Sequence, residues 1–162
     1  PLRRQRQMCI RDRKGGVGKT TSTINLGACL AEQGRKVLLV DLDPQGALSA
    51  GLGVSYEEDQ VTVYDLLFDN TASIHAAINT TNVSGLDVVP ANIDLSAAEI
   101  QLVNEVGREH TLARALRPVR NEYDFIILDC GPSLGLLTVN ALACSHGVII
   151  PMECEYLSLI HI

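Results

Sequence analysis

The sequence predicts an α/β fold built on a doubly wound, mostly parallel sheet flanked by helices. Short apolar runs rich in branched aliphatic residues alternate with longer stretches of helical periodicity, which is typical of parallel strands joined by helical crossovers. The composition agrees, because 46% of the residues are apolar, only 4% are aromatic and 13 are glycines. A chain of 162 residues is long enough to bury one core, so we expect one domain.

Four apolar runs are the predicted strands. They are residues 36–41 (KVLLVD), 86–90 (LDVVP), 124–129 (DFIILD) and 147–151 (GVIIP). Each is rich in β-branched or aliphatic residues, as expected of a parallel strand that is buried on both faces.

Helices are predicted at residues 19–33, 96–106, 111–119 and 134–143. The first carries apolar residues at helical spacing and stops at Gly34, since glycine is a common C-terminal stop. Ser96 and Glu99 fit a capping box that opens the second helix. Strands and helices therefore alternate along the chain.

Composition and charge exclude several classes of protein. No stretch approaches the roughly 18 apolar residues of a membrane span, and the basic start lacks the apolar region of a signal peptide. Five cysteines without a CxxC pair indicate neither a disulfide framework nor a zinc site, so we expect a cytoplasmic protein. The net charge is −6, and after residue 13 it is −10, from 8 basic and 18 acidic residues. A body this acidic is not expected to bind DNA strongly by itself.

The segment 14–21 reads KGGVGKTT and leads directly into a predicted helix. It is close to the phosphate-binding pattern GxxxxGK[ST], except that Arg13 stands where the first glycine would be. The glycines let successive backbone N–H groups face an anion, Lys19 supplies a charge for the β- and γ-phosphates, and Thr20 offers a hydroxyl to Mg²⁺. The alternative is an ordinary glycine-rich turn, which the carboxylates downstream disfavour.

Those carboxylates end predicted strands. Asp129 closes one apolar run at the sheet edge where open α/β sheets bind ligands, so it fits an acid that holds Mg²⁺, through water. Asp41 and Asp43 end another, and Asp43 is placed to orient a water for attack on a γ-phosphate. Asp41 fits a turn or capping role equally well, because Asp-Pro-Gln-Gly is good turn chemistry.

Four segments together carry a family resemblance. They are KGGVGKTT (14–21), VLLVDLDPQG (37–46), DFIILDCGPSLGLLTVNAL (124–142) and ECEY (153–156). In this order and spacing they resemble the ParA/Soj chromosome and plasmid partitioning ATPases, relatives of MinD with a deviant Walker A motif. The resemblance implies a P-loop NTPase fold, truncated at both ends, with residues 14–156 as a partial ATPase domain.

The resemblance also implies cofactors, roles and partners. ATP and Mg²⁺ would be bound, with catalytic roles for Lys14, Lys19 and Asp43 and metal-binding roles for Thr20 and Asp129. Nucleotide contacts would come from Lys14, Gly15, Gly16, Val17, Gly18, Lys19, Thr20 and Thr21. Lys14 would be the signature lysine that reaches across an ATP-dependent homodimer to the partner's phosphates. A ParB-like protein and, for the full-length parent on the nucleoid, non-specific DNA would be the other partners, without a membrane.

Three other functions are weighed against this one. A MinD-like membrane-associated positioning ATPase would need a C-terminal amphipathic helix, and the segments SGLG, VYDLL and CEY are closer to Soj. An iron-sulfur carrier would use Cys130, but a small buried cysteine is expected there, since no second cysteine lies at a matching loop. A regulator that binds nucleotide without hydrolysis is disfavoured because Lys14, Lys19, Asp43 and Asp129 are all present.

Both ends of the chain depart from the family pattern. The family has an apolar strand before the phosphate loop, whereas QMCIRDR at residues 7–13 predicts a poor buried strand. MCIRDR can be encoded by ATGTGTATAAGAGACAG, and LSLIHI at 157–162 by its reverse complement, a DNA word that resembles a transposon-end adapter. We therefore expect residues 1–13 and 157–162 to be translated adapter, with the only arginine cluster inside it. Within the domain, Gly131 stands where the family usually has a proline.

Overall fold

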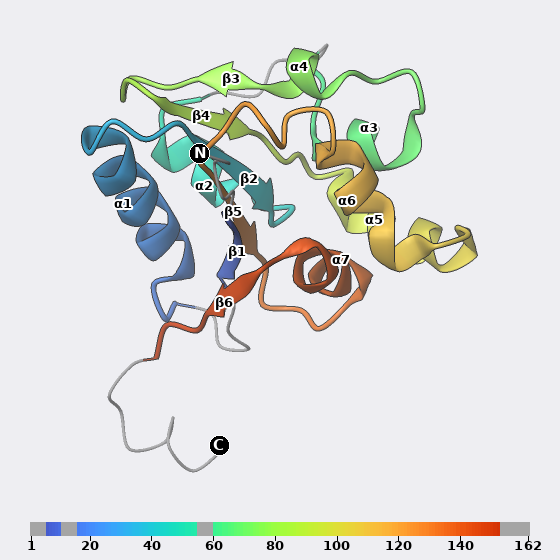
Figure 1. The fold of residues 1–162 in the computed structure, drawn as a ribbon. Helices are drawn as coiled ribbons and strands as arrows, with labels where there is room; N and C mark the ends of the chain where they lie inside the picture. The colour runs from blue at the N-terminus through green and yellow to red at the C-terminus, as the bar shows by residue number, and fades with distance from the viewer. Residues whose placement is uncertain (1–5, 11–15, 55–59, 153–162) are drawn as a thin grey trace.

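A six-stranded sheet forms the centre of the computed structural model, which describes residues 6–10, 16–54 and 60–152 (Figure 1). The strands are β1 (Arg6–Ile10), β2 (Val37–Leu42), β3 (Asn79–Thr80), β4 (Leu86–Val89), β5 (Phe125–Cys130) and β6 (Gly147–Ile149). Their order is β3-β4-β2-β5-β1-β6, and every pair is parallel except β3 with β4. From β1 the chain continues to β2 and β4 on one side of the sheet, whereas β6 is added on the other side of β1. Strands on both sides of the first one are typical of a doubly wound sheet.

Helices cover both faces of this sheet. They are α1 (Lys19–Glu32), α2 (Ala47–Gly51), α3 (Val63–Phe68), α4 (Ile74–Ala77), α5 (Leu95–Gln101), α6 (Thr111–Leu116) and α7 (Leu136–Cys144), with 3₁₀ turns at Leu102–Asn104 and Arg108–His110. Buried residues of α1 and α2 cluster with one face, and those of α3 to α7 cluster with the other. The predicted fold class is therefore confirmed.

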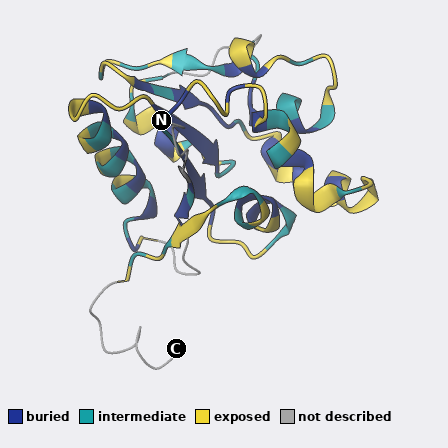
Figure 2. Cartoon of the chain, in the orientation of Figure 1, coloured by how far each residue is buried: buried dark blue, intermediate teal, exposed yellow. Residues whose placement is uncertain are grey.

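The central strands are buried on both faces, as Figure 2 shows by their dark blue colour. In β2, Leu38 and Val40 pack towards α3 to α7, whereas Val37 and Leu39 pack towards α1. All four side chains are 0% exposed. This two-sided burial explains why the strands appear in the sequence as unbroken apolar runs, and it fixes the sheet edge that carries the site.

The four predicted strands are found within a residue or two of their expected bounds. The helix expected at 96–106 is shorter, because α5 ends at Gln101 and a 3₁₀ turn follows it. The capping box expected from Ser96 and Glu99 is wrong: the helix begins at Leu95 after Asp94, and the Glu99 carboxylate accepts hydrogen bonds from the first turn of α7 instead.

The expectation of a poor strand before the phosphate loop is also wrong. Residues Arg6–Ile10 form β1, which lies between β5 and β6, and Cys9 and Ile10 are 0% exposed. The charged run 11–13 follows the strand and lies outside the described residues, so it places no charge within the part of the sheet that the structure describes. The adapter origin of residues 1–13 and 157–162 is a separate matter and stays a prediction.

Candidate phosphate-binding site

The phosphate loop leads from β1 to α1, and its described part begins at Gly16. Gly16 and Gly18 have φ values of 86° and 83°, in the left-handed region that favours glycine. A Cβ on either glycine would meet no atom within 4 Å, so the space above the loop is open. Lys14 and Gly15, both predicted to contact nucleotide, lie outside the described residues.

Helix α1 begins directly after this loop and presents its first turn to the open space. Gly18 is the N-cap and has no side chain to bond the first N–H groups of the helix, so these remain available to an anion. Val17 and Lys19 are each 8% exposed. Burial raises the pKa of the Asp129 carboxyl, and the nearby charge of Lys19 partly opposes that rise. Thr20 is half-buried and Thr21 is exposed in the same turn.

Asp129, near the end of β5, carries the clearest sign of a cation site. Its Oδ1 accepts a hydrogen bond from Thr23 Oγ1 at 3.3 Å, whereas its Oδ2 is buried and has no hydrogen-bond partner within the described part of the chain. Burial raises the pKa of Asp129, and the neighbouring hydroxyls of Thr20 and Thr23 oppose that rise. A buried carboxylate oxygen without a donor is costly, and a bound cation would remove the cost.

Asp41 lies beside Asp129 in the sheet register but has different surroundings. Its Oδ1 accepts from the Asp43 N–H at 3.1 Å, and its Oδ2 accepts from the N–H and the hydroxyl of Ser49 at 3.2 and 3.1 Å. Burial raises the pKa of Asp41 to about 6, although these donors oppose the shift. The turn role expected for Asp41 fits these contacts, because its carboxylate accepts hydrogen bonds from both the turn after β2 and helix α2.

Asp43 stands in that turn and is half-exposed. Its Oδ1 accepts a hydrogen bond from the Gln45 N–H at 3.0 Å. A Cβ on Gly131 would lie 3.5 Å from the Asp43 carboxyl carbon, so this carboxylate packs against the start of the segment that follows β5. Asp43 also raises the pKa of Asp129 through its charge. The structure thus brings Lys19, Thr20, Asp43 and Asp129 to one sheet edge.

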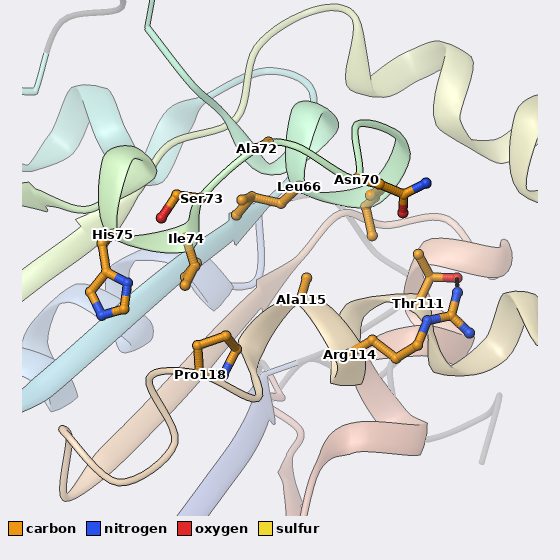
Figure 3. A pocket seen from close by; sticks show the side chains of 11 residues that line it. Leu66, Asn70, Ala72, Ser73, Ile74, His75, Thr111, Arg114, Ala115 and Pro118 are labelled. Atoms are coloured by element: carbon orange, nitrogen blue, oxygen red, sulfur yellow. Dashed lines mark hydrogen bonds between the residues drawn. The ribbon is translucent and has the colours of Figure 1, made fainter.

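Two cavities lie outside this cluster. One of about 530 Å³ adjoins the turn of Asp43 and is lined by segments 44–46 and 90–94. The other, of about 350 Å³, lies between α3, α4 and α6 and holds none of the predicted site residues; Figure 3 shows Arg114 in its wall, with Nη2 donating to Thr111 Oγ1 at 3.1 Å. The phosphate site is therefore a feature of the loop and not of the cavity in Figure 3.

Cysteines do not form a metal centre in the described residues. Cys130 is buried, as expected, but it has a neighbour that the sequence did not suggest: its Sγ lies 3.0 Å from Cys9 Sγ on the adjacent strand. This contact and burial raise the pKa of Cys130. No group of three or more His, Cys, Asp or Glu residues suited to a metal ion occurs in the ranges that the structure covers.

The surface charge differs from expectation in one place. Arg114, Arg117 and Arg120 are exposed on α6 and the turn after it, and they make no ion pair within the described part of the chain. The N-terminal arginines are therefore not the only cluster, and that expectation is wrong. Among the described helices, none combines the length and apolarity that crossing a membrane requires.

Several residues that shape the site were missed by the sequence analysis. Thr23 follows Thr20 by three positions, so helical spacing alone places both hydroxyls on the side of α1 that faces Asp129. Ser49, which holds Asp41, comes from a segment with no motif. Glu99 fits a local capping pattern in the sequence, which gives no sign that its carboxylate holds α7. Only the tertiary structure brings these two side chains to their partners.

A glycine loop that enters a helix from a parallel strand, opposite an acidic strand end, is the defining feature of the P-loop NTPase fold. The chain matches the family model described as "AAA domain" over residues 5–161, and it belongs to that family and, within it, to the ParA/Soj group.

Relatives and solved structures agree with this assignment. The chain is 65% identical over 152 residues to the uncharacterized protein MT1749 of Mycobacterium tuberculosis, covering 94% of this chain and 47% of the relative. It is 53% identical over 152 residues to the sporulation initiation inhibitor protein Soj of Bacillus subtilis, covering 94% and 60%. A structure titled cobyrinic acid a,c-diamide synthase from Mycobacterium smegmatis, with bound ATP analog and magnesium, superposes with a TM-score of 0.90 at 45% identity, covering 96% and 63%. The chain thus spans about half the length of its curated relatives.

Proposed function

We propose that this chain is the nucleotide-binding part of an ATP-dependent DNA-partitioning ATPase that acts in chromosome or plasmid segregation. The observation that carries the proposal is the buried Oδ2 of Asp129, which has no hydrogen-bond partner among the described residues and lies beside Thr20, next to a glycine loop. The 53% identity over 148 residues to the chromosome-partitioning ATPase Soj of Treponema pallidum supports partitioning as the purpose of the ATPase. The structure bound to an ATP analog and magnesium supports ATP as the substrate.

The described residues fit Mg²⁺ and a triphosphate. Thr20 and Asp129 would hold Mg²⁺, because a hydroxyl and a carboxylate are the oxygen ligands that this ion prefers. The N–H groups of residues 16–18 and of the first turn of α1 would bind phosphate oxygens, with Lys19 neutralising their charge. When bound, Mg²⁺ would neutralise the negative charge that develops on the phosphate oxygens during phosphoryl transfer.

Two residues carry the proposed chemistry beyond binding. Asp43 would orient the attacking water, since its carboxylate projects from a turn that Asp41 and Ser49 hold in place. Lys14 would act across a homodimer on the partner's phosphates, as the family resemblance implies. Hydrolysis would then depend on dimerisation, and a ParB-like protein would stimulate it. The full-length parent, rather than this acidic part, would bind non-specific DNA on the nucleoid.

The test of nucleotide binding is a titration of the purified chain with a fluorescent ATP analogue and Mg²⁺. Lys19→Ala should weaken affinity at least tenfold, because it removes the buried charge next to the phosphates. Lys36→Ala is the matched control, since Lys36 is exposed at the opposite end of β2. Equal affinity of the Lys19→Ala variant and the unmodified chain would refute the assignment.

A further inference from the structure

The segment 131–135, which connects β5 to α7, is contacted at its start, in its middle and at its end. At its start, Gly131 packs against the carboxylate of Asp43. In its middle, the backbone oxygen of Ser133 accepts a hydrogen bond from Thr138 Oγ1 at 2.8 Å. At its end, a carboxylate from another helix holds the backbone. We call residues 131–135 the β5–α7 loop.

That carboxylate belongs to Glu99 on α5. Its Oε2 accepts a hydrogen bond from the Leu136 N–H at 2.6 Å, and its Oε1 accepts from the Leu137 N–H at 3.4 Å. The first N–H groups of a helix have no partner within the helix, and a negative charge there is favourable. Glu99 therefore caps α7 from a distance of 37 positions in the sequence.

Gly135 leaves the space that the Glu99 carboxylate occupies. A Cβ at position 135 would overlap both carboxylate oxygens of Glu99. The backbone of Gly135 is extended, with φ −80° and ψ −171°, so glycine is required for space and not for an unusual conformation. The close approach of Glu99 to α7 thus depends on the missing side chain.

The packing of α5 against the core fixes the position of Glu99. On the inner side of α5, Leu95 and Ala98 are 0% exposed, and Leu102 after it is also 0% exposed. Because α5 is packed in this way, the Glu99 carboxylate holds the first turn of α7 in a fixed place. It thereby limits where the β5–α7 loop lies relative to Asp43.

We propose that Glu99 is a positioning residue for the ATP site: it fixes the end of the β5–α7 loop and so couples that loop to the nucleotide through Asp43. This inference rests on the proposed function. Glu99 itself touches neither nucleotide nor metal in this account, because its oxygens are occupied by α7.

The cap is tested by hydrogen exchange of the Leu136 and Leu137 amides, measured by NMR on the full chain. Glu99→Ala should speed both at least tenfold, and Glu99→Gln, which keeps an acceptor oxygen, should give intermediate rates. Glu105→Ala is the control, because Glu105 is exposed just after the same helical segment. Unchanged exchange in Glu99→Ala would overturn the proposal.

Gly135→Ala tests the same contact from the other side. Alone, it should speed exchange at both amides, since the methyl group displaces the carboxylate. In the Glu99→Ala background it should add less than a twofold change, because no oxygen remains to be displaced. Independent, additive effects would contradict a matched pair.

Coupling to the site is tested with Mg²⁺ and a non-hydrolysable ATP analogue. In the unmodified chain, saturation with nucleotide should slow exchange at Leu136 and Leu137 at least threefold. Glu99→Ala should bind with an affinity within threefold of the unmodified chain and lose this response. Binding in both chains with the same response would overturn the positioning role alone, whereas absence of binding in both would overturn the proposed function.

Discussion

Asp41 and Asp129 are register partners on the neighbouring strands β2 and β5, yet only Asp129 keeps a carboxylate oxygen without a donor within the described residues. Three hydrogen bonds from Asp43 and Ser49 occupy both oxygens of Asp41. Two buried acids side by side thus have different tasks. The first organises a turn, and the second is available to a cation.

The buried state of Asp41 predicts a pH dependence of stability. Its pKa is about 6 in the folded chain against 3.8 for an ordinary Asp, so the folded state binds the proton more tightly. The stabilisation by that proton is complete below pH 3.8 and is lost as the pH rises through about 6. The loss amounts to about 3 kcal/mol.

Asp41→Asn removes this titration. Urea unfolding at pH 4 and pH 7 should show the variant gaining about 2 kcal/mol of stability relative to the unmodified chain between the two pH values. Titrating groups far from Asp41 cancel in the comparison, whereas Asp129 does not cancel fully, because its charge contributes to the raised pKa of Asp41. A stability difference that does not change with pH would show that Asp41 is not the group responsible.

Gly18→Ala should destabilise the chain by about 1–2 kcal/mol, because alanine is strained at a φ of 83°. It should also weaken nucleotide binding, since the loop cannot keep its shape. Gly147→Ala is the control: Gly147 is exposed, and a Cβ there meets nothing within 4 Å. Thermal unfolding and nucleotide titration check both effects, and equal behaviour of the two variants would contradict the loop geometry.

Asn140→Ala should cost about 2–3 kcal/mol, as expected when buried hydrogen-bonding groups lose their partners. The Asn140 side chain accepts from the Leu112 N–H at 3.1 Å and donates to the backbone oxygens of Arg108 and Leu136 at 2.7 and 2.9 Å. The neighbouring Val139→Ala, at a side chain that is 41% exposed, should cost well under half as much. Urea unfolding of both variants measures the difference, and similar losses would contradict the role of Asn140 in joining α7 to α6.

The sequence alone predicts the strands, loop and site residues that a local pattern marks. Strand β2 shows its burial in an unbroken apolar run, and the glycines at 16 and 18 show the loop in their spacing. Lys19, Thr20 and Asp129 were found because a motif or a strand end marks each one. These features need no knowledge of what packs against them.

Other features depend on tertiary contacts, and the sequence could not supply them. Glu99 satisfied a local capping pattern with Ser96, but its carboxylate bonds the distant α7 instead. The charged run 11–13 suggested that β1 would fail, although the charges follow the strand and do not interrupt it. The adapter origin of both ends remains a prediction, which sequencing of the gene across residues 1–13 and 157–162 tests.

Asp43→Ala should separate ATP binding from hydrolysis in the full-length parent. The variant should bind ATP and remain a dimer, because the proposed water-orienting carboxylate is removed while the phosphate loop is intact. Lys14→Ala should instead suppress both dimerisation and hydrolysis and keep much of the affinity. Light scattering with ATP measures the dimer, and a monomer in both the unmodified parent and Asp43→Ala would refute the dimer mechanism.

The most direct test of the site is calorimetric titration of ATP with and without Mg²⁺, on the unmodified chain and on Asp129→Asn. Mg²⁺ should raise the affinity of the unmodified chain at least tenfold. Asp129→Asn should lose most of that gain, because it removes the charge of the carboxylate whose Oδ2 lacks a donor among the described residues. Asp41→Asn is the matched control and should keep the gain, since its oxygens already have donors. Equal Mg²⁺ dependence in the unmodified chain and Asp129→Asn would contradict the placement of the cation at the end of β5.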